Sequence, residues 1–183
     1  FINIIEIGKE GNNFFEIMEE ASFGNLDKLI KSKELNISNI YLLVESINKS
    51  LEVLHKNNII HRDLKPSNIL IKNNNPFEFA LADFGISSVI EEGFSKKLTS
   101  KKGTELYWAP EASAGVVRKE SDYFSLGVIV LEMILGKHPL LGLNEQLIIA
   151  TMRTKGISVP EEIDSNLKTL IKGLVTRDPG KRW

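Results

Sequence analysis

Four polar side chains near the middle of the chain have the chemistry that phosphoryl transfer requires. Asp63 and Asn68 stand five positions apart, and Asp83 follows after two short apolar runs. Phosphoryl transfer needs a carboxylate that accepts the proton of the attacking hydroxyl, and hard oxygen ligands that hold Mg²⁺ across the nucleotide phosphates. Asp63 suits the first role, and Asn68 and Asp83 suit the second. Lys65 can reach a transferred phosphoryl group as a point charge.

Taken singly, each of these residues is a common turn former, so the pattern depends on their combination and order. The segment from His61 to Asn68 is HRDLKPSN, residues 83–85 are DFG, and residues 109–111 are APE. In this order they resemble the catalytic loop, the metal-binding triplet and the end of the activation segment of eukaryotic-type (Hanks-type) serine/threonine protein kinases.

The resemblance extends along the rest of the chain. Gly103–Trp108 is similar to the substrate-docking loop of that family, and Asp122–Gly127 is similar to the start of its central buried helix. Asp178–Arg182 resembles the motif whose Arg pairs with the Glu of the APE triplet. The resemblance therefore implies a buried bidentate ion pair between Arg182 and Glu111.

The resemblance also implies an ATP site. Met18 would control the back of the adenine pocket, the backbone at Glu19 and Ala21 would bind adenine, and Leu70 would form the floor of the pocket. Without the resemblance, Met18 and Leu70 would be interpreted as ordinary core residues. The phosphates and Mg²⁺ (or Mn²⁺) would be contacted by Lys65, Asn68 and Asp83, with Asn68 and Asp83 as the metal ligands.

Two residues favour serine and threonine as the phosphate acceptors. Lys65 and Thr104 are the residues that serine/threonine kinases of this family carry at their positions, and Thr104 is expected to hydrogen-bond near Asp63 and Lys65. The implied function is transfer of the ATP γ-phosphoryl group to Ser or Thr hydroxyls of protein substrates. The catalytic set would be Asp63, Lys65, Asn68 and Thr104.

Regulation by phosphorylation is a further hypothesis. In the family, the Arg before the catalytic Asp, here Arg62, often holds a phosphorylated activation loop through charge-assisted hydrogen bonds. Ser100 is the candidate phosphosite, and Thr99 and Ser95 are alternatives. Ser88 stands where a second basic partner is often found, and this departure weakens the hypothesis.

The histidines are not expected to act as bases. His61 would pack under Phe84 in a hydrophobic stack, as in the family. His55, at the end of a long helix, is interpreted as a cap or surface group, and His138, next to Pro139, as a turn residue.

Hydrophobic periodicity predicts an α+β fold. Spacing of three and four from Ile40 to Leu54 indicates one buried face of a helix that begins near Ser38, the expected N-cap, and ends at Asn57 and Asn58. The resemblance implies a protein-kinase-like fold, with residues 1–20 as the last two N-lobe strands and the hinge, and residues 21–183 as the helical C-lobe. Predicted strands are 1–7, 14–18, 59–60, 69–71 and 79–81; further helices start at 26 and cover 121–135, 144–155 and 166–175; residues 91–102 are a surface loop.

Composition is that of a globular protein. The 183 residues are 42% apolar and 26% charged, the net charge is −1, and there is no cysteine. Nothing here indicates a nucleic-acid partner or membrane contact by this segment, and the oligomeric state is not indicated. Residues 126–135, interrupted by Glu132, are too short for a membrane span, which needs about 20 apolar residues. We expect a cytoplasmic location, with membrane attachment through other segments left open.

Some motifs of the family are not found in this sequence. The chain has no glycine-rich phosphate loop and no strand lysine for the α- and β-phosphates, both of which would precede Phe1. We therefore expect residues 1–183, as an excised fragment, to bind ATP weakly and to be inactive alone. Two alternatives stay open. One is a pseudokinase or scaffold. The other is a small-molecule phosphotransferase of the aminoglycoside-kinase type, although those enzymes lack the docking loop and the APE triplet.

Overall fold

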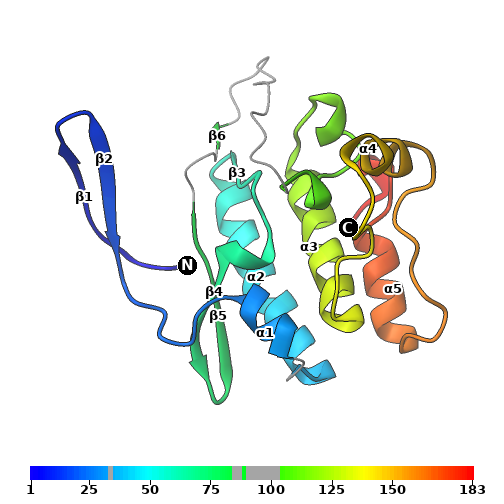
Figure 1. Ribbon diagram of the computed structural model, residues 1–183, viewed down its shortest axis with the longest axis horizontal. Helices are drawn as coiled ribbons and strands as arrows, with labels where there is room; N and C mark the ends of the chain where they lie inside the picture. Colours follow the sequence, from blue (N-terminus) through cyan, green and yellow to red (C-terminus); the bar gives the residue numbers. More distant parts are fainter. Residues whose placement is uncertain (33–34, 84–87, 90–103) are drawn as a thin grey trace.

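The computed structural model describes residues 1–32, 35–83, 88–89 and 104–183. A small β-hairpin projects from a larger, mainly helical body (Figure 1). The strands are β1 (Ile4–Glu10), β2 (Asn13–Met18), β3 (Ile59–Ile60), β4 (Ile69–Asn74), β5 (Phe77–Leu81) and β6 (Ser88–Val89). The helices are α1 (Leu26–Ser32), α2 (Ile37–Lys56), α3 (Lys119–Leu135), α4 (Glu145–Thr154) and α5 (Ser165–Leu174). Short 3₁₀ turns are η1 (Pro66–Asn68), η2 (Thr104–Tyr107), η3 (Ala112–Ala114) and η4 (Pro179–Lys181). The predicted α+β class is confirmed.

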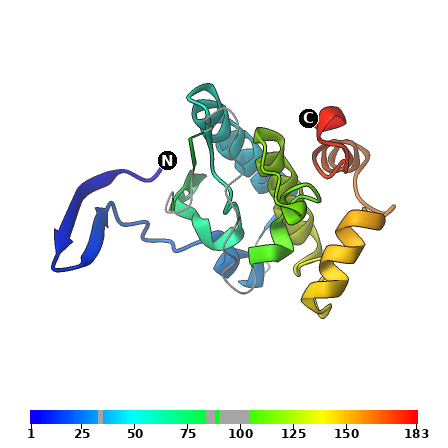
Figure 2. The ribbon, with the colours of Figure 1, turned by 90° about the horizontal axis from the view of Figure 1, so that it is seen from above.

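The hairpin is formed by β1 and β2, which pair antiparallel around a turn at Gly11, where φ is +60°. Its first strand begins at Ile4, three residues later than predicted. Ile2 is instead buried against the body, where its backbone N–H donates to the Leu81 carbonyl at 3.0 Å. Most side chains of the hairpin are exposed, and Figure 2 shows it on the opposite side of the body from α4 and α5.

Helix α2 has the predicted buried face, but its N-cap is Asn36 and not Ser38. The Asn36 side chain accepts from the backbone N–H of Asn39 at 2.9 Å, and the Asn39 side chain accepts from that of Asn36 at 3.0 Å. This reciprocal capping box satisfies two backbone donors that would otherwise lack a partner at the start of the helix. Ser38 lies inside the first turn, and the helix ends at Asn57, as predicted.

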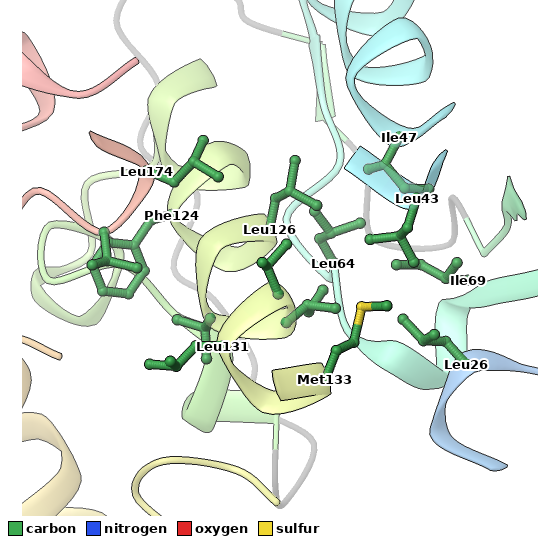
Figure 3. Packing of buried hydrophobic residues seen from close by; sticks show 14 of the residues in the cluster. Leu26, Leu43, Ile47, Leu64, Ile69, Phe124, Leu126, Leu131, Met133 and Leu174 are labelled. Carbon is green, nitrogen blue, oxygen red and sulfur yellow. The ribbon is translucent and has the colours of Figure 1, made fainter. Parts of the chain in front are cut away.

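Helix α3 runs through the middle of the body and is buried on nearly all sides. Its side chains, with those of α1 and α2, form the core shown in Figure 3. Gly127 allows α5 to approach closely, since a Cβ there would lie 2.7 Å from the Cβ of Leu174. The observed ends of α3, α4 and α5 differ from the predicted ends by at most two residues, and Asn144 and Asp164 cap α4 and α5.

The ladder β4–β5 lies against α2 and pairs Ile69 with Leu81. Because β3 ends at Ile60 and β4 begins at Ile69, the HRDLKPSN segment forms the connection between them. The predicted loop 91–102 lies outside the described residues. In the part of the chain that the structure covers, no helix combines the length and apolar character needed to cross a membrane.

Candidate active site

The backbone of the loop from 61 to 68 is held by Asp122 at the start of α3. One carboxylate oxygen of Asp122 accepts from the backbone N–H of His61 and the other from that of Arg62, both at 3.0 Å. Arg62 has φ of +71°, a left-handed conformation that costs a non-glycine residue about 1–3 kcal/mol. The two hydrogen bonds offset this strain, because Asp122 is only 1% exposed and its acceptors are fixed by the helix.

His55 is part of this support, so its interpretation as a cap or surface group was wrong. Its Nε2 lies 2.9 Å from the Oδ2 of Asp122, and both residues are buried. The end of α2 packs against α3, which places the ring beside Tyr123 as well. One signal in the sequence was available: His55 stands four residues after the buried Leu51, on the same helix face.

Asp63 has one carboxylate oxygen fixed and the other unpaired. Its Oδ2 lies 2.7 Å from the Nζ of Lys65 and accepts from the Nδ2 of Asn68 at 3.1 Å. Its Oδ1 is buried and has no hydrogen-bond partner among the described residues. A buried acceptor without a partner is costly. This oxygen is therefore the atom of the site best suited to accept a proton from an incoming hydroxyl.

Asn68 is oriented by the same contacts. Its Nδ2 also donates to the backbone carbonyl of Asp63 at 2.9 Å, so both Nδ2 contacts are made within the loop. The Oδ1 then points away from Asp63, within 3.4 Å of the Ser67 hydroxyl. An amide oxygen held in this way is a suitable hard ligand for Mg²⁺.

The β4–β5 ladder brings Ala82, the residue before Asp83, to Asn68. The backbone N–H of Ala82 donates to the Asn68 carbonyl at 2.9 Å, and Asp83 follows with φ of +63°. Among the described residues, no three His, Cys, Asp or Glu side chains cluster to hold an ion without a further ligand. Two oxygen donors fit a metal that also binds substrate phosphates, which is the usual arrangement for Mg²⁺.

His61 is completely buried between the loop and β5. Its Nδ1 accepts from the backbone N–H of Asp63 at 3.3 Å, so its Nε2 carries the proton and donates to the Ala82 carbonyl at 3.2 Å. Burial lowers the pKa of His61 below its ordinary value, although Asp122 and the Ala82 carbonyl oppose this. The ring is therefore neutral at pH 7. Phe84, its expected stacking partner, lies outside the described residues.

The residues predicted to bind adenine are brought together in part. Ala21 and Leu70 pack on a small buried cluster of Ile2, Ala80 and Ala82. Met18 is not in this cluster; it ends β2 and is 42% exposed.

The backbone of the predicted hinge is also engaged. The N–H of Glu19 donates to the Asn3 carbonyl at 2.9 Å, and the Ala21 carbonyl accepts from Gly24 at 3.0 Å. Any adenine contact at Glu19 would therefore use its carbonyl.

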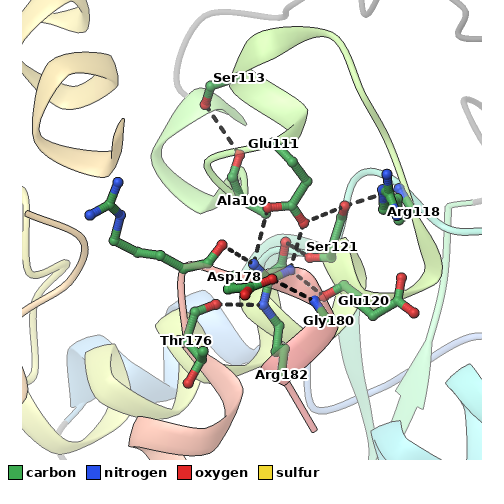
Figure 4. A network of polar contacts seen from close by, with 12 residues as sticks. Ala109, Glu111, Ser113, Arg118, Glu120, Ser121, Thr176, Asp178, Gly180 and Arg182 are labelled. Atoms are coloured by element: carbon green, nitrogen blue, oxygen red, sulfur yellow. Dashed lines mark hydrogen bonds and ion pairs between the residues drawn. The ribbon is translucent and has the colours of Figure 1, made fainter. Parts of the chain in front are cut away.

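The predicted pair of Arg182 and Glu111 is confirmed (Figure 4). The two terminal nitrogens of Arg182 lie 2.5 Å and 3.0 Å from the two carboxylate oxygens of Glu111. Carbonyl oxygens of Thr176, Arg177 and Glu120 accept the remaining donors of the guanidinium. This pair fixes the APE triplet to the C-terminal end of the chain.

Comparison with known proteins agrees with this geometry. The model of the family described as "Protein kinase domain" matches residues 1–183. The chain belongs to the protein kinase family. Calcium-dependent protein kinase 4 of Plasmodium berghei is 32% identical over 184 residues, which cover 95% of this chain and 34% of that protein. The probable serine/threonine-protein kinase fhkC of Dictyostelium discoideum is 31% identical over 191 residues, covering 100% of this chain and 32% of that protein.

A plant relative is equally similar. The calcium and calcium/calmodulin-dependent serine/threonine-protein kinase DMI-3 of Medicago truncatula is 33% identical over 196 residues, covering 99% of this chain and 36% of that protein. The chain thus spans about a third of the length of the curated relatives it matches. Membership of the kinase family implies ATP as a substrate, and a divalent metal typically accompanies it.

The turn η2, part of the predicted docking loop, is held by α3. Thr104 begins η2, and its side chain is outside the described part. The Tyr107 hydroxyl donates to Glu132 at 2.7 Å, and the Tyr107 carbonyl accepts from Ser125 at 2.8 Å. Burial raises the pKa of both Tyr107 and Glu132. The phenol of Tyr107 therefore stays neutral, and the Glu132 carboxyl is a weaker acid than an exposed one.

His138 lies in the turn after α3, as predicted, but it is buried. Its carbonyl accepts from the N–H of Leu141, and its Nδ1 accepts from the N–H of Leu140 at 3.1 Å. Its ring meets that of Tyr107 edge-on at 5.0 Å. Burial lowers the pKa of His138 to about 4.

The hypothesis of regulation by phosphorylation stays a prediction. Ser95, Thr99 and Ser100 lie outside the described residues. The Nε of Arg62 is buried without a hydrogen-bond partner within the part of the chain that the structure covers.

Proposed function

We propose that this kinase domain transfers the γ-phosphoryl group of ATP to Ser or Thr hydroxyls of protein substrates. The observation that carries the proposal is the state of Asp63: one oxygen is fixed by Lys65 and Asn68, and the other is buried with no hydrogen-bond partner among the residues that the structure describes. This arrangement leaves a single oxygen to receive the proton of the attacking hydroxyl. The relatives from D. discoideum and M. truncatula are named as serine/threonine kinases, which supports the choice of acceptor.

The other residues have defined roles in this proposal. Lys65, already beside Asp63, would contact the transferred phosphoryl group as a point charge. Asn68 Oδ1 and Asp83 would hold Mg²⁺ or Mn²⁺ against the nucleotide phosphates, and the ion would offset charge that develops there. Thr104 would align the acceptor hydroxyl.

The nucleotide would lie between the hairpin and the body. Ala21 and Leu70, which share one apolar cluster, would contact adenine, with Met18 and the backbone of Glu19 beside them. Residues 1–20 would then belong to the small lobe and hinge, and residues 21–183 to the large lobe. Because the proposed reaction consumes ATP, an intracellular location is part of the proposal.

Asp63→Asn tests the proposal. In the natural full-length product that contains this chain, transfer of radiolabelled phosphate from ATP to Ser/Thr peptides should fall by about 10²–10⁴-fold, with ATP binding retained. Asp164→Asn is the matched control, since Asn caps a helix as well as Asp does, and it should leave transfer unchanged. Asp63→Asn with wild-type transfer would contradict the proposal. A wild-type protein that binds ATP but transfers no phosphate would favour the scaffold alternative.

A further inference from the structure

A buried polar cluster holds the turn η2 against the body. The Tyr107 hydroxyl donates to the Oε2 of Glu132 at 2.7 Å, and the Tyr107 carbonyl accepts from the Ser125 hydroxyl at 2.8 Å. Ser125 and Glu132 both belong to α3, and each is only 8% exposed. Tyr107 is therefore fixed to α3 twice, through its backbone and through the end of its side chain.

His138, in the turn after α3, packs on this cluster from another side. Its ring meets the Tyr107 ring edge-on, with 5.0 Å between the centroids and an angle of 78° between the planes. Its Nδ1 accepts from the backbone N–H of Leu140 at 3.1 Å, and its buried Nε2 makes no hydrogen bond within the described residues. The ring is neutral at pH 7, because burial lowers its pKa to about 4. What His138 offers to Tyr107 is thus a packed, uncharged ring.

This packing protects the hydrogen bond between Tyr107 and Glu132. Burial is the main cause of the raised pKa of both residues, so the bond lies in a poorly solvated place. A hydrogen bond is stronger in such a place than in water. If the ring of His138 were removed, the space left beside polar groups could admit water. Water would then compete for the Tyr107 hydroxyl, and the turn would lose part of its attachment to α3.

The turn that Tyr107 ends is the one predicted to dock the substrate. It is four residues long, begins at Thr104, and is closed by a hydrogen bond from the Trp108 N–H to the Glu105 carbonyl at 3.2 Å. In so short a turn, a shift of Tyr107 moves the other residues with it. Misplacement by about 1 Å, caused by a mutation far from the reacting atoms, can cost about 10²-fold in activity. The packing around Tyr107 therefore bears on the binding of the acceptor peptide.

We propose that His138 is a substrate-positioning residue, whose ring fixes Tyr107 and, through it, the turn η2 against which the acceptor peptide binds. The effect on peptide binding rests on the proposed function, whereas the restraint on η2 does not.

Three variants of the natural full-length product separate the ring of His138 from its hydrogen bond. His138→Ala removes both, His138→Asn keeps an acceptor for the Leu140 N–H, and His138→Phe keeps a ring. The KM for a Ser/Thr peptide should rise at least about fivefold in the Ala and Asn variants, with kcat and the KM for ATP changed less than about twofold. The Phe variant should stay within about twofold of the wild type in all three quantities.

Hydrogen exchange followed by mass spectrometry measures the restraint itself. The amides of Tyr107 and Trp108 should exchange at least about fivefold faster in the Ala and Asn variants, and the Phe variant should exchange as the wild type does. Leu167→Ala is the matched control, because Leu167 is only 2% exposed on α5 and its loss also leaves a buried space. It should lower the melting temperature without changing the peptide KM or exchange at η2.

An unchanged peptide KM in His138→Ala would overturn the proposal, and so would a rise in KM that Leu167→Ala or His138→Phe reproduces. If His138→Ala did not fold, the comparison of His138→Asn with His138→Phe would decide the same question. A wild-type protein that transferred no phosphate would contradict the proposed function. In that case, faster exchange at η2 in His138→Asn than in His138→Phe would still support the restraint, and equal exchange would overturn it.

Discussion

Replacing Arg182 by Ala should lower the free energy of unfolding by about 3–5 kcal/mol, the usual cost of breaking a buried ion pair from one side. The Arg182 side chain has no exposed surface, and that of Glu111 is 11% exposed. Without Arg182, the Ser121 hydroxyl is the only side-chain donor to the Glu111 carboxylate among the described residues. The contact of the guanidinium with the Phe124 ring, at 5.1 Å, is lost as well. An uncompensated buried charge therefore dominates the cost.

Urea unfolding followed by far-ultraviolet circular dichroism measures this change. For a chain of this size, 3–5 kcal/mol corresponds to a fall in melting temperature of about 10 °C. Arg153→Ala is the control: Arg153 is exposed on α4, and its loss should cost no more than about 0.5 kcal/mol. The double variant Glu111→Leu/Arg182→Met should cost less than Arg182→Ala alone, because it leaves no unpaired charge.

Two results would refute this reasoning. One is a cost below about 1 kcal/mol for Arg182→Ala, which is the range of exposed ion pairs. The other is a double variant whose loss of unfolding free energy equals the sum of the losses of its two single variants.

The dependence of stability on pH gives an independent check of the same pair. Burial raises the pKa of Glu111, but the hydrogen bonds from Arg182 and the other contacts outweigh this and lower it below 4.5. The pair therefore stabilises the fold above the unfolded pKa and loses this contribution as the pH falls through the lower, folded pKa. Glu111→Gln should remove this part of the acid sensitivity.

Three further predictions concern other positions. Gly127→Ala should destabilise the fold by about 1–3 kcal/mol, because the added Cβ meets Leu174 at 2.7 Å; a neutral effect in thermal unfolding would show that the helices can move apart. Asp122→Asn should lower kcat about 10–100-fold, the equivalent of one charged hydrogen bond, with KM for ATP within about twofold; a steady-state assay in which KM changes instead would contradict its role in the catalytic loop. Because its folded pKa of about 4 lies below the unfolded value of 6.5, His138 stays neutral in the fold while the unfolded chain gains a proton. The contribution of this residue to the free energy of unfolding should thus fall by about 3 kcal/mol between pH 7 and pH 4. Unfolding curves of His138→Gln recorded across this pH range should not show that part of the fall.

Local patterns predicted the elements well, and the misses have physical causes. The spacing of Ile40, Leu43 and Ile47 on α2 follows the helical period, so burial of that face was predictable. The N-cap was not, because Asn36 and Ser38 are both good capping residues, and only the reciprocal bonds of Asn36 and Asn39 distinguish them. Propensity ranks residue types; it does not say which side chain reaches a given N–H.

In the candidate site, too, some features could be predicted from the sequence and others could not. The roles expected of Asp63, Lys65 and Asn68 follow from residue type and short spacing, and a compact loop brings such neighbours together in almost any fold. That one oxygen of Asp63 has no partner within the described part of the chain is a property of the packed structure.

What the sequence determined by itself is the family, the order of the elements and the set of polar residues suited to phosphoryl transfer. The tertiary structure alone decided that His55 supports the predicted catalytic loop through Asp122, and that Lys72 meets Glu19. In each case the partners are more than fifty residues apart. Such contacts leave no periodic trace in the chain, because they exist only after α2 has packed on α3, and after β4 has joined the base of the hairpin.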